Sequence, residues 1–257
     1  MSDDLVLGVD SSTQSCKALL LRADDGTTVA TGRAAHPDGT EVDPRAWLEA
    51  VDQAAAGLLE RAAAVAVGGQ QHGMVALDDD GSPVRDALLW NDTRSAAAAD
   101  QLVEEMGGAQ ACAEAVGSVL VASFTITKLR WVRDHEPEAA ARTAQVLLPH
   151  DYVGWHLSGR TSAPATDRGD ASGTGYWSPA TQEWRPDLAA AALGRDVRLP
   201  RVAGPGEVVG QVPSSRAVIG AGTGDNMAAA LGLGAEAGDV VVSVGTSGVA
   251  SMVTSAP

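Results

Sequence analysis

The first third of the chain alternates short apolar runs with tight polar turns, and this pattern restricts the fold more than any other feature. The apolar runs cover residues 5–9, 18–21 and 28–31. Such runs, separated by a Ser/Thr/Gln cluster and an Asp-Asp-Gly turn, predict three consecutive antiparallel strands. A helix over 46–64, opened by Pro44 in its first turn, and a buried strand at 65–69 are predicted next. A meander followed by such crossovers predicts an α/β fold with a mixed sheet covered by helices.

Composition and charge exclude several classes of protein. Of the 257 residues, 45% are hydrophobic and 20% are charged, which is typical of a folded globular chain. The formal net charge of -15 has the wrong sign for binding a phosphate backbone or an anionic membrane surface, so neither nucleic acid nor membrane is an expected partner. No run of 18 apolar residues occurs and the first residues carry no basic segment, which predicts a cytoplasmic protein. Cys16 and Cys112 match no metal-binding spacing and predict no disulfide framework.

Polar side chains follow the first apolar run. Asp10 precedes Ser11, Ser12 and Thr13, and Lys17 stands four residues after Thr13. A carboxylate at a strand end can orient hydrated Mg²⁺ while Thr13, Lys17 and the turn amides contact triphosphate oxygens. The same residues can instead only satisfy a hairpin turn, and the segment alone favours that alternative. Lys17 shifts the balance slightly towards phosphate, because the chain has only one other lysine.

Two more polar segments follow apolar runs. Gln71 and His72, flanked by glycines, come after the buried run at 65–69, and Trp90 and Asp92 stand where the next apolar stretch ends. Amide and imidazole groups at a strand end suit the binding of several hydroxyls of a polar small molecule. Open sheets bind ligands at such strand ends. A histidine that only stabilises its loop, and Asp92 as a helix N-cap, are the alternatives.

In the C-terminal segment, polar residues again follow an apolar run. Asp225 and Asn226 follow an apolar run at 217–220 and precede a helix predicted over 227–233. Asp225 can act there as a general base or as an N-cap. A hairpin is predicted from strands at 240–244 and 249–253, and its turn has residue types that line phosphates: Gly245, Thr246, Ser247 and Gly248. A hairpin at each end of the chain predicts a duplicated lobe that clamps a nucleotide.

At these residues the sequence resembles the FGGY carbohydrate kinases, and among them the members that act on D-xylulose. The most specific segment is 123–135, which fits the family's first signature at every constrained position. Structural roles are expected for Lys128 and Trp131 within it. The resemblance covers the whole chain. The other supporting segments are 10–17, 69–73, 90–92, 147–152, 224–226 and 242–248.

The resemblance implies an actin-like, hexokinase-like ATPase fold of the ribonuclease H-like type, with two lobes of related topology around a cleft. The family's chains are nearly twice as long, so a complete first lobe and an incomplete second lobe are expected. The sugar-binding lobe is expected at 1–215 and the start of the ATP-binding lobe at 216–257.

The resemblance also implies ATP-dependent phosphorylation of the terminal hydroxyl of D-xylulose. Asp225 matches the base that deprotonates the sugar, and Asp10 matches the carboxylate near Mg²⁺, which it would hold through water. The positions matched to sugar contacts, or expected beside them, are Gln71, His72, Trp90, Asp92 and Asn226. The positions expected along the phosphates of ATP are Thr13, Lys17, Gly245, Thr246, Ser247 and Gly248. A homodimer is expected from the family.

Three alternatives remain open from the sequence. The chain can bind sugar without turnover, it can serve another polyol such as glycerol, ribulose or gluconate, or it can be a filament-forming or regulatory ATPase. The kinase hypothesis requires Asp10 and Asp225 to converge on one crevice, although 215 positions separate them in the sequence.

Overall fold

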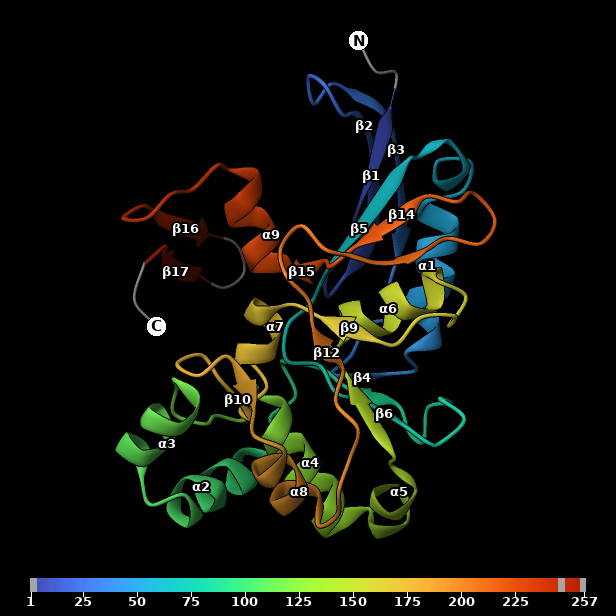
Figure 1. Ribbon diagram of the computed structural model, residues 1–257. Coiled ribbons are helices and arrows are strands. Elements are labelled where there is room, and N and C mark those ends of the chain that lie inside the picture. Colours follow the sequence, from blue (N-terminus) through green and yellow to red (C-terminus); the bar gives the residue numbers. More distant parts are fainter. Residues whose placement is uncertain (1–3, 245–247, 255–257) are drawn as a thin grey trace.

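A mixed sheet forms the centre of the computed structural model, which describes residues 4–244 and 248–254 (Figure 1). Its strands in spatial order are β13 (Val208–Gln211), β14 (Val218–Gly220), β5 (Ala64–Gly69), β1 (Leu5–Ser11), β2 (Ser15–Arg22) and β3 (Thr28–Ala35). A seventh strand, β15 (Thr223–Gly224), also pairs with β5. The predicted mixed sheet is confirmed.

The predicted three-strand meander is confirmed at the N-terminus. β1 and β2 are antiparallel, with Asp10 opposite Lys17, and β2 and β3 are antiparallel. The turn after β2 contains Gly26 at φ 70°, a left-handed conformation that glycine adopts without steric cost. β5 and β14 run parallel to β1 and to each other, so the carboxyl ends of β1 and β5 lie at one edge of the sheet.

Helices α1 (Arg45–Ala54) and α6 (Pro149–Leu157) pack on this sheet. Trp47 of α1 is 1% exposed and lies in the same hydrophobic cluster as Leu7 and Leu20 of the strands. The helix predicted over 46–64 is wrong in length, because α1 ends at Ala54 and only a 3-10 turn, Leu59–Arg61, follows. Gly57 at φ 70° redirects the backbone between them.

A second, mainly helical layer contains its own hydrophobic cluster. Its helices are α2 (Ala96–Glu105), α3 (Ala109–Val116), α4 (Thr125–His135), α5 (Pro137–Arg142) and α8 (Pro186–Leu193). α4 packs against α2, α5 and α8, and Ile126 and Leu129 on it are fully buried. The family signature thus supplies the central helix of this layer (Figure 1).

Short two-stranded pairings lie outside the central sheet. The pairs are β4 (Glu41–Val42) with β7 (Ala87–Leu88), β6 (Val75–Leu77) with β8 (Gln145–Leu147), β9 (Ala165–Thr166) with β12 (Arg201–Val202), and β10 (Trp177–Ser178) with β11 (Glu183–Trp184). Residues 158–186 contain three of these strands and helix α7 (Arg168–Ser172). Trp177 is 3% exposed.

The last part of the chain leaves the central sheet. Helix α9 (Asp225–Gly232) leads to β16 (Val240–Val244) and β17 (Gly248–Met252), which form the predicted hairpin. The two-lobe division at 215/216 stays a prediction, but β14 and β15 lie beyond that point and belong to the first sheet. None of the helices in the described part of the chain has the length and hydropathy that crossing a bilayer requires.

Candidate functional site

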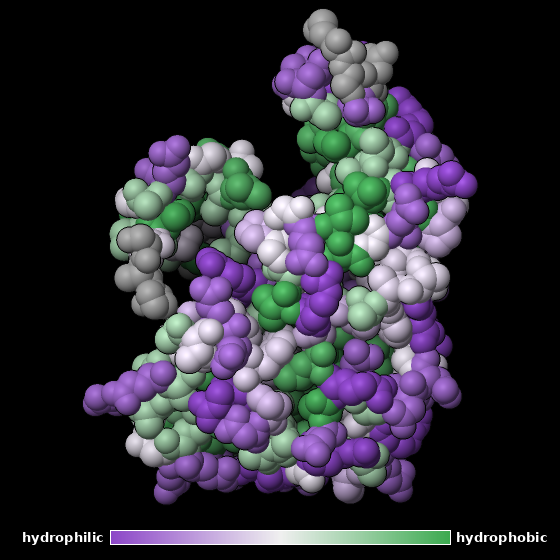
Figure 2. All heavy atoms as spheres, viewed as in Figure 1, coloured by the Kyte–Doolittle hydropathy of each residue, from purple (hydrophilic) through white to green (hydrophobic). Residues whose placement is uncertain are grey.

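The strand ends at one edge of the central sheet bring Asp10 and Asp225 together. Asp10, near the end of β1, is paired with Gly68 of β5. On the other side of β5, Gly224 is paired with Gly69, and Asp225 follows as the first residue of α9. The molecular surface is hollowed between the segment α9, β16 and β17 and the N-terminal sheet (Figure 2). The two carboxylates therefore flank the end of the same strand.

The environment of Asp225 suits a proton acceptor. Burial raises the pKa of its carboxyl to about 6; the hydrogen bond from the Asn226 amide opposes this rise, and the negative charges of Asp10 and Asp170 add to it. The Asn226 amide donates to Asp225 Oδ1 over 2.8 Å. A carboxyl with a pKa near the working pH can both accept a proton and release it again. The surroundings of Asp225 thus give it a raised pKa, and its general-base role stays a prediction.

The residues predicted to contact sugar lie beside Asp225. Asn226 Nδ2 donates to Gln71 Oε1 over 3.1 Å, although 155 positions separate the two residues. His72 has a left-handed backbone, φ 64°, and its Nδ1 donates to the Gly173 carbonyl over 2.8 Å. Because burial also lowers the pKa of His72, its imidazole is neutral and Nε2 is left as an acceptor. Together these groups offer amide and imidazole partners for hydroxyls.

Trp90 and Thr13 form a second contact between predicted site residues. Trp90 Nε1 donates to Thr13 Oγ1 over 2.8 Å, and Trp90 is 41% exposed. The ring is therefore linked to the turn between β1 and β2, which precedes Lys17.

Asp92 lies deeper than the other predicted sugar contacts. It is 4% exposed and accepts hydrogen bonds from Thr40 and Arg94, which are 2.7 and 2.9 Å from its oxygens. The structure thus uses Asp92 to hold its loop, and a contact with sugar stays a prediction.

Lys17 pairs with the carboxylate expected to face the metal. Its Nζ lies 3.0 Å from Asp10 Oδ2, and both side chains are partly exposed. Of the predicted phosphate turn, Gly245, Thr246 and Ser247 lie outside the described residues, while Gly248 begins β17.

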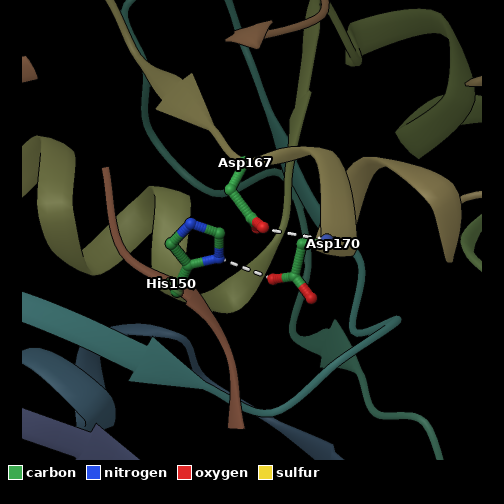
Figure 3. Close-up of side chains that lie close together, drawn as sticks. All are labelled: His150, Asp167 and Asp170. Atoms are coloured by element: carbon green, nitrogen blue, oxygen red, sulfur yellow. Dashed lines mark hydrogen bonds and ion pairs between the residues drawn. The ribbon is translucent and has the colours of Figure 1, made fainter. Parts of the chain in front are cut away.

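A buried cluster that the sequence analysis did not identify lies directly behind this edge of the sheet (Figure 3). His150, the second residue of α6, has Nδ1 2.5 Å from Asp170 Oδ2 and Nε2 3.4 Å from Asp151 Oδ1. Asp167 caps α7, accepting from the Gly169 and Asp170 amides, and also accepts from Thr223 Oγ1 over 3.0 Å. The cluster therefore connects α6, α7 and β15.

The protonation of this cluster follows from its charges. Burial alone would lower the pKa of His150, but the charges of Asp151 and Asp170 raise it to about 9. Burial raises the pKa of Asp151 to about 7. Because its pKa is raised and Nδ1 faces the Asp170 carboxylate, His150 is an imidazolium at neutral pH.

Local sequence signals for this cluster exist but are weak. Asp167 stands three residues before Asp170, which is the spacing of a capped helix start, and Pro149 is typical of a first helical position. These signals predict two helix starts but not their contact.

Comparison with known proteins identifies the family. The model of the N-terminal domain of the FGGY family of carbohydrate kinases matches residues 5–232. The chain belongs to the FGGY family of carbohydrate kinases. Its sequence is 51% identical over 264 residues to the xylulose kinase of Streptomyces coelicolor, with 97% of this chain and 54% of that relative covered. It is 34% identical to the xylulose kinase of Escherichia coli, covering 95% of this chain and 53% of that relative.

Solved structures of FGGY kinases agree with this assignment. The xylulose kinase from Bifidobacterium adolescentis superposes with a TM-score of 0.92 at 42% identity, covering 96% of this chain and 58% of that structure. The expected α/β fold of the family is thus confirmed. This FGGY chain spans about half the length of the curated relatives it matches, and it corresponds to the N-terminal half of xylulose kinases.

Proposed function

We propose that this chain is the sugar-binding half of a D-xylulose kinase, which transfers the terminal phosphoryl group of ATP to D-xylulose and releases D-xylulose 5-phosphate and ADP. The observation that carries the proposal is the placement of Asp225, with its raised pKa, beside the Gln71–Asn226 pair and across β5 from Asp10. The similarity to proteins named xylulose kinase supports D-xylulose as the sugar.

Asp225 acts as the general base in this proposal. Its carboxylate accepts the proton of the terminal sugar hydroxyl as the oxygen attacks the phosphoryl group. Asn226, Gln71 and His72 hold the other hydroxyls, so that the reacting oxygen stays next to Asp225. In this proposal, the three residues raise the rate by orienting the sugar, and Asp225 raises it by having a pKa near the working pH.

The residues on the β1 edge fit a nucleotide and its metal. Asp10 offers partly exposed carboxylate oxygens, the hard ligands that Mg²⁺ prefers through water, and Lys17 offers a cation to phosphate oxygens. ATP would supply the phosphoryl group, and Mg²⁺ held by Asp10 through water would offset the charge of its phosphates. Thr13, and the turn at 245–248, are the further phosphate contacts in this proposal. The homodimer stays a prediction.

A cytoplasmic location is part of the same proposal. Cys16 and Cys112 are both buried and free, as is common for proteins of a reducing compartment.

The second candidate is a sugar-binding module without turnover. The chain spans about half the length of the xylulose kinases it matches, and the exposed β16–β17 hairpin pairs only with itself among the described residues. In this candidate, Gln71, His72 and Asn226 bind the sugar and the chain does not bind ATP.

Calorimetric titration with D-xylulose and with ATP, beside a coupled ADP-release assay, tests the proposal. Binding of D-xylulose is expected, and glycerol, D-ribulose and gluconate are expected to bind more weakly. Asp225→Asn should retain sugar binding, because the amide keeps the position of the carboxyl, and should lower any turnover by about a hundredfold or more.

Each outcome of these measurements decides between the candidates. D-xylulose binding without ATP binding or ADP release favours the module. Tighter binding of another polyol rejects D-xylulose as the substrate, and unchanged turnover in Asp225→Asn rejects the base assignment. Concentration-dependent polymers without sugar binding would revive the filament alternative.

A further inference from the structure

The buried imidazole of His150 lies against the turn that leads to Asp225. Gly222 has φ 71°, and a Cβ added there would lie 2.9 Å from His150 Cδ2 and 2.5 Å from the Val67 carbonyl oxygen. A Cβ at Gly69, on the partner strand, would lie 2.8 Å from His150 Cβ. The end of β5 and the turn before β15 therefore both rest directly on His150.

Asp170 lies under the next residues of the same turn. A Cβ at Gly224 would lie 2.6 Å from Asp170 Oδ1, so the carboxylate touches the backbone immediately before Asp225. Asp170 Oδ1 is buried and has no hydrogen-bond partner among the described residues, while Oδ2 is bonded to His150. Asp170 belongs to α7, and the N-cap residue of this helix, Asp167, accepts a hydrogen bond from the Thr223 hydroxyl.

From these contacts we propose that His150 and Asp170 are positioning residues for Asp225. The buried pair fixes the position of the backbone from Gly222 to Gly224. Asp170 also keeps a negative charge close to the Asp225 carboxylate. The inference rests on the proposed function, since it concerns how the proposed base is held in the sugar site.

The same cluster is arranged as an ion pair and not as a metal site. His150 Nδ1 and Asp170 Oδ2 are 2.5 Å apart, a hydrogen-bond distance, and they face each other with no space for an ion between them. The second ring nitrogen faces Asp151. The imidazolium of His150 thus supplies the positive charge that pairs with the Asp170 carboxylate.

Asp151 provides a matched control, because it is the other buried carboxylate on the same imidazole. Its Oδ2 accepts from the Leu148 amide over 2.8 Å, at the start of α6 and away from the Gly224 turn. Removing either carboxylate leaves His150 with one partner, and both changes are expected to lower the melting temperature. Only the loss of Asp170 is expected to alter the sugar site.

The experiment compares Asp170→Ala with Asp151→Ala in the 257-residue chain. For Asp170→Ala, the dissociation constant of D-xylulose should rise about tenfold or more, because the hydrogen bond between the hydroxyl and a displaced Asp225 is lost. The pKa of Asp225, followed by carboxyl ¹³C NMR, should fall, because a nearby negative charge is removed. Asp151→Ala should leave both quantities unchanged.

Asp170→Asn separates position from charge. The amide keeps the shape and the contact with Gly224, so D-xylulose affinity should return to within a few fold of the unmodified chain, roughly the difference of a weakened hydrogen bond. The pKa of Asp225 should still be lowered in this variant. A simple loss of stability would not produce this split.

The proposal is overturned if Asp170→Ala and Asp151→Ala change the sugar affinity and the Asp225 pKa to the same extent. If Asp170→Ala does not fold, Asp170→Asn takes its place, because the amide keeps the shape of the side chain and removes its charge. Its control is Asp151→Asn, the same change at the other carboxylate beside His150. Equal pKa values of Asp225 in these two variants also overturn the proposal.

A failure of the proposed function can be told apart from a failure of this inference. If the unmodified chain binds no D-xylulose, the proposed function is rejected for this chain. The Asp225 titration in the Asp170 and Asp151 variants then decides the positioning role by itself.

Discussion

At the residue scale, Lys128 is a buried base that the proposed chemistry does not use. Its side chain is 0% exposed within α4, and its Nζ donates to the carbonyl oxygens of Ala122 and Ser123 over 2.9 and 2.5 Å. Burial lowers the pKa of Lys128 to about 7, against the opposing charge of Asp92. Lys128 therefore fastens the loop before α4, in line with the structural role expected from the sequence.

The lowered pKa of Lys128 predicts that the contribution of this side chain to stability rises with pH. Between pH 7 and about 10.5 the unfolded chain holds a proton on Lys128 that the folded chain has released, so the contribution of Lys128 to the free energy of unfolding increases with pH across that window. In Lys128→Met this increase should be absent. Urea unfolding at pH 7, 8 and 9.5 would measure the difference between the two proteins.

The stability difference between the unmodified chain and Lys128→Met should grow by up to about 1.4 kcal/mol per pH unit in this window. Ile126→Val, a truncation in the same helix without a titrating group, should show a constant difference. A constant difference for Lys128→Met as well would contradict the assignment.

At the element scale, the contact between β3 and α1 depends on a glycine. A Cβ at Gly32 would lie 1.9 Å from the carbonyl oxygen of Ala54, the last residue of α1. Both atoms that would clash are fixed by the backbone, so no side-chain rotation can relieve the overlap. The sheet and its covering helix approach this closely only because residue 32 has no side chain.

Gly32→Ala is expected to lower the free energy of unfolding by about 1–3 kcal/mol or more, because the helix must move away from the sheet. The matched control is Gly8→Ala on β1, where an added Cβ meets nothing within 4 Å. Alanine there removes conformational freedom from the unfolded chain and should be neutral or stabilising. Chemical denaturation of both variants measures this; equal destabilisation would mean that the β3–α1 approach is looser than described.

At the scale of the whole molecule, local stability should be uneven. The central sheet is covered by helices, whereas the hairpin of β16 and β17 extends away from it (Figure 1). Val240, Val242 and Val244 of β16 are 60%, 64% and 86% exposed. An isolated two-stranded hairpin is only marginally stable in water.

Amide hydrogen exchange should therefore separate the two regions. The amides of β16 and β17 are expected to exchange by local opening, whereas those paired between β1 and β5 should require opening of the whole sheet. Mass spectrometry of peptides from both regions would measure the protection. Equal protection of the hairpin and the sheet would show that the C-terminal segment is stabilised by contacts beyond the hairpin pairing.

The charge of the whole molecule also constrains ligand binding. With 33 acidic and 18 basic residues, the long-range field repels anions. In the proposed function, an anionic nucleotide therefore depends on local groups such as Lys17 and backbone amides.

The sequence by itself determined most of the elements and supplied the candidate site residues. The meander, the buried strand β5 and the C-terminal hairpin follow from apolar runs and turn residues that are close together in the chain. The signature on α4 and the positions of Asp10 and Asp225 follow from motifs. The length of α1 could not be read in this way, because a run of alanines extends its helical pattern past Ala54.

Only the tertiary structure decided how these residues act together. The contact between Asn226 and Gln71, the raised pKa of Asp225, and the ion pair of His150 and Asp170 all join segments that are far apart in the sequence. Sequence periodicity reports which face of an element is buried, but not which element covers it. Burial and nearby charge set a pKa, and both exist only once the chain has folded.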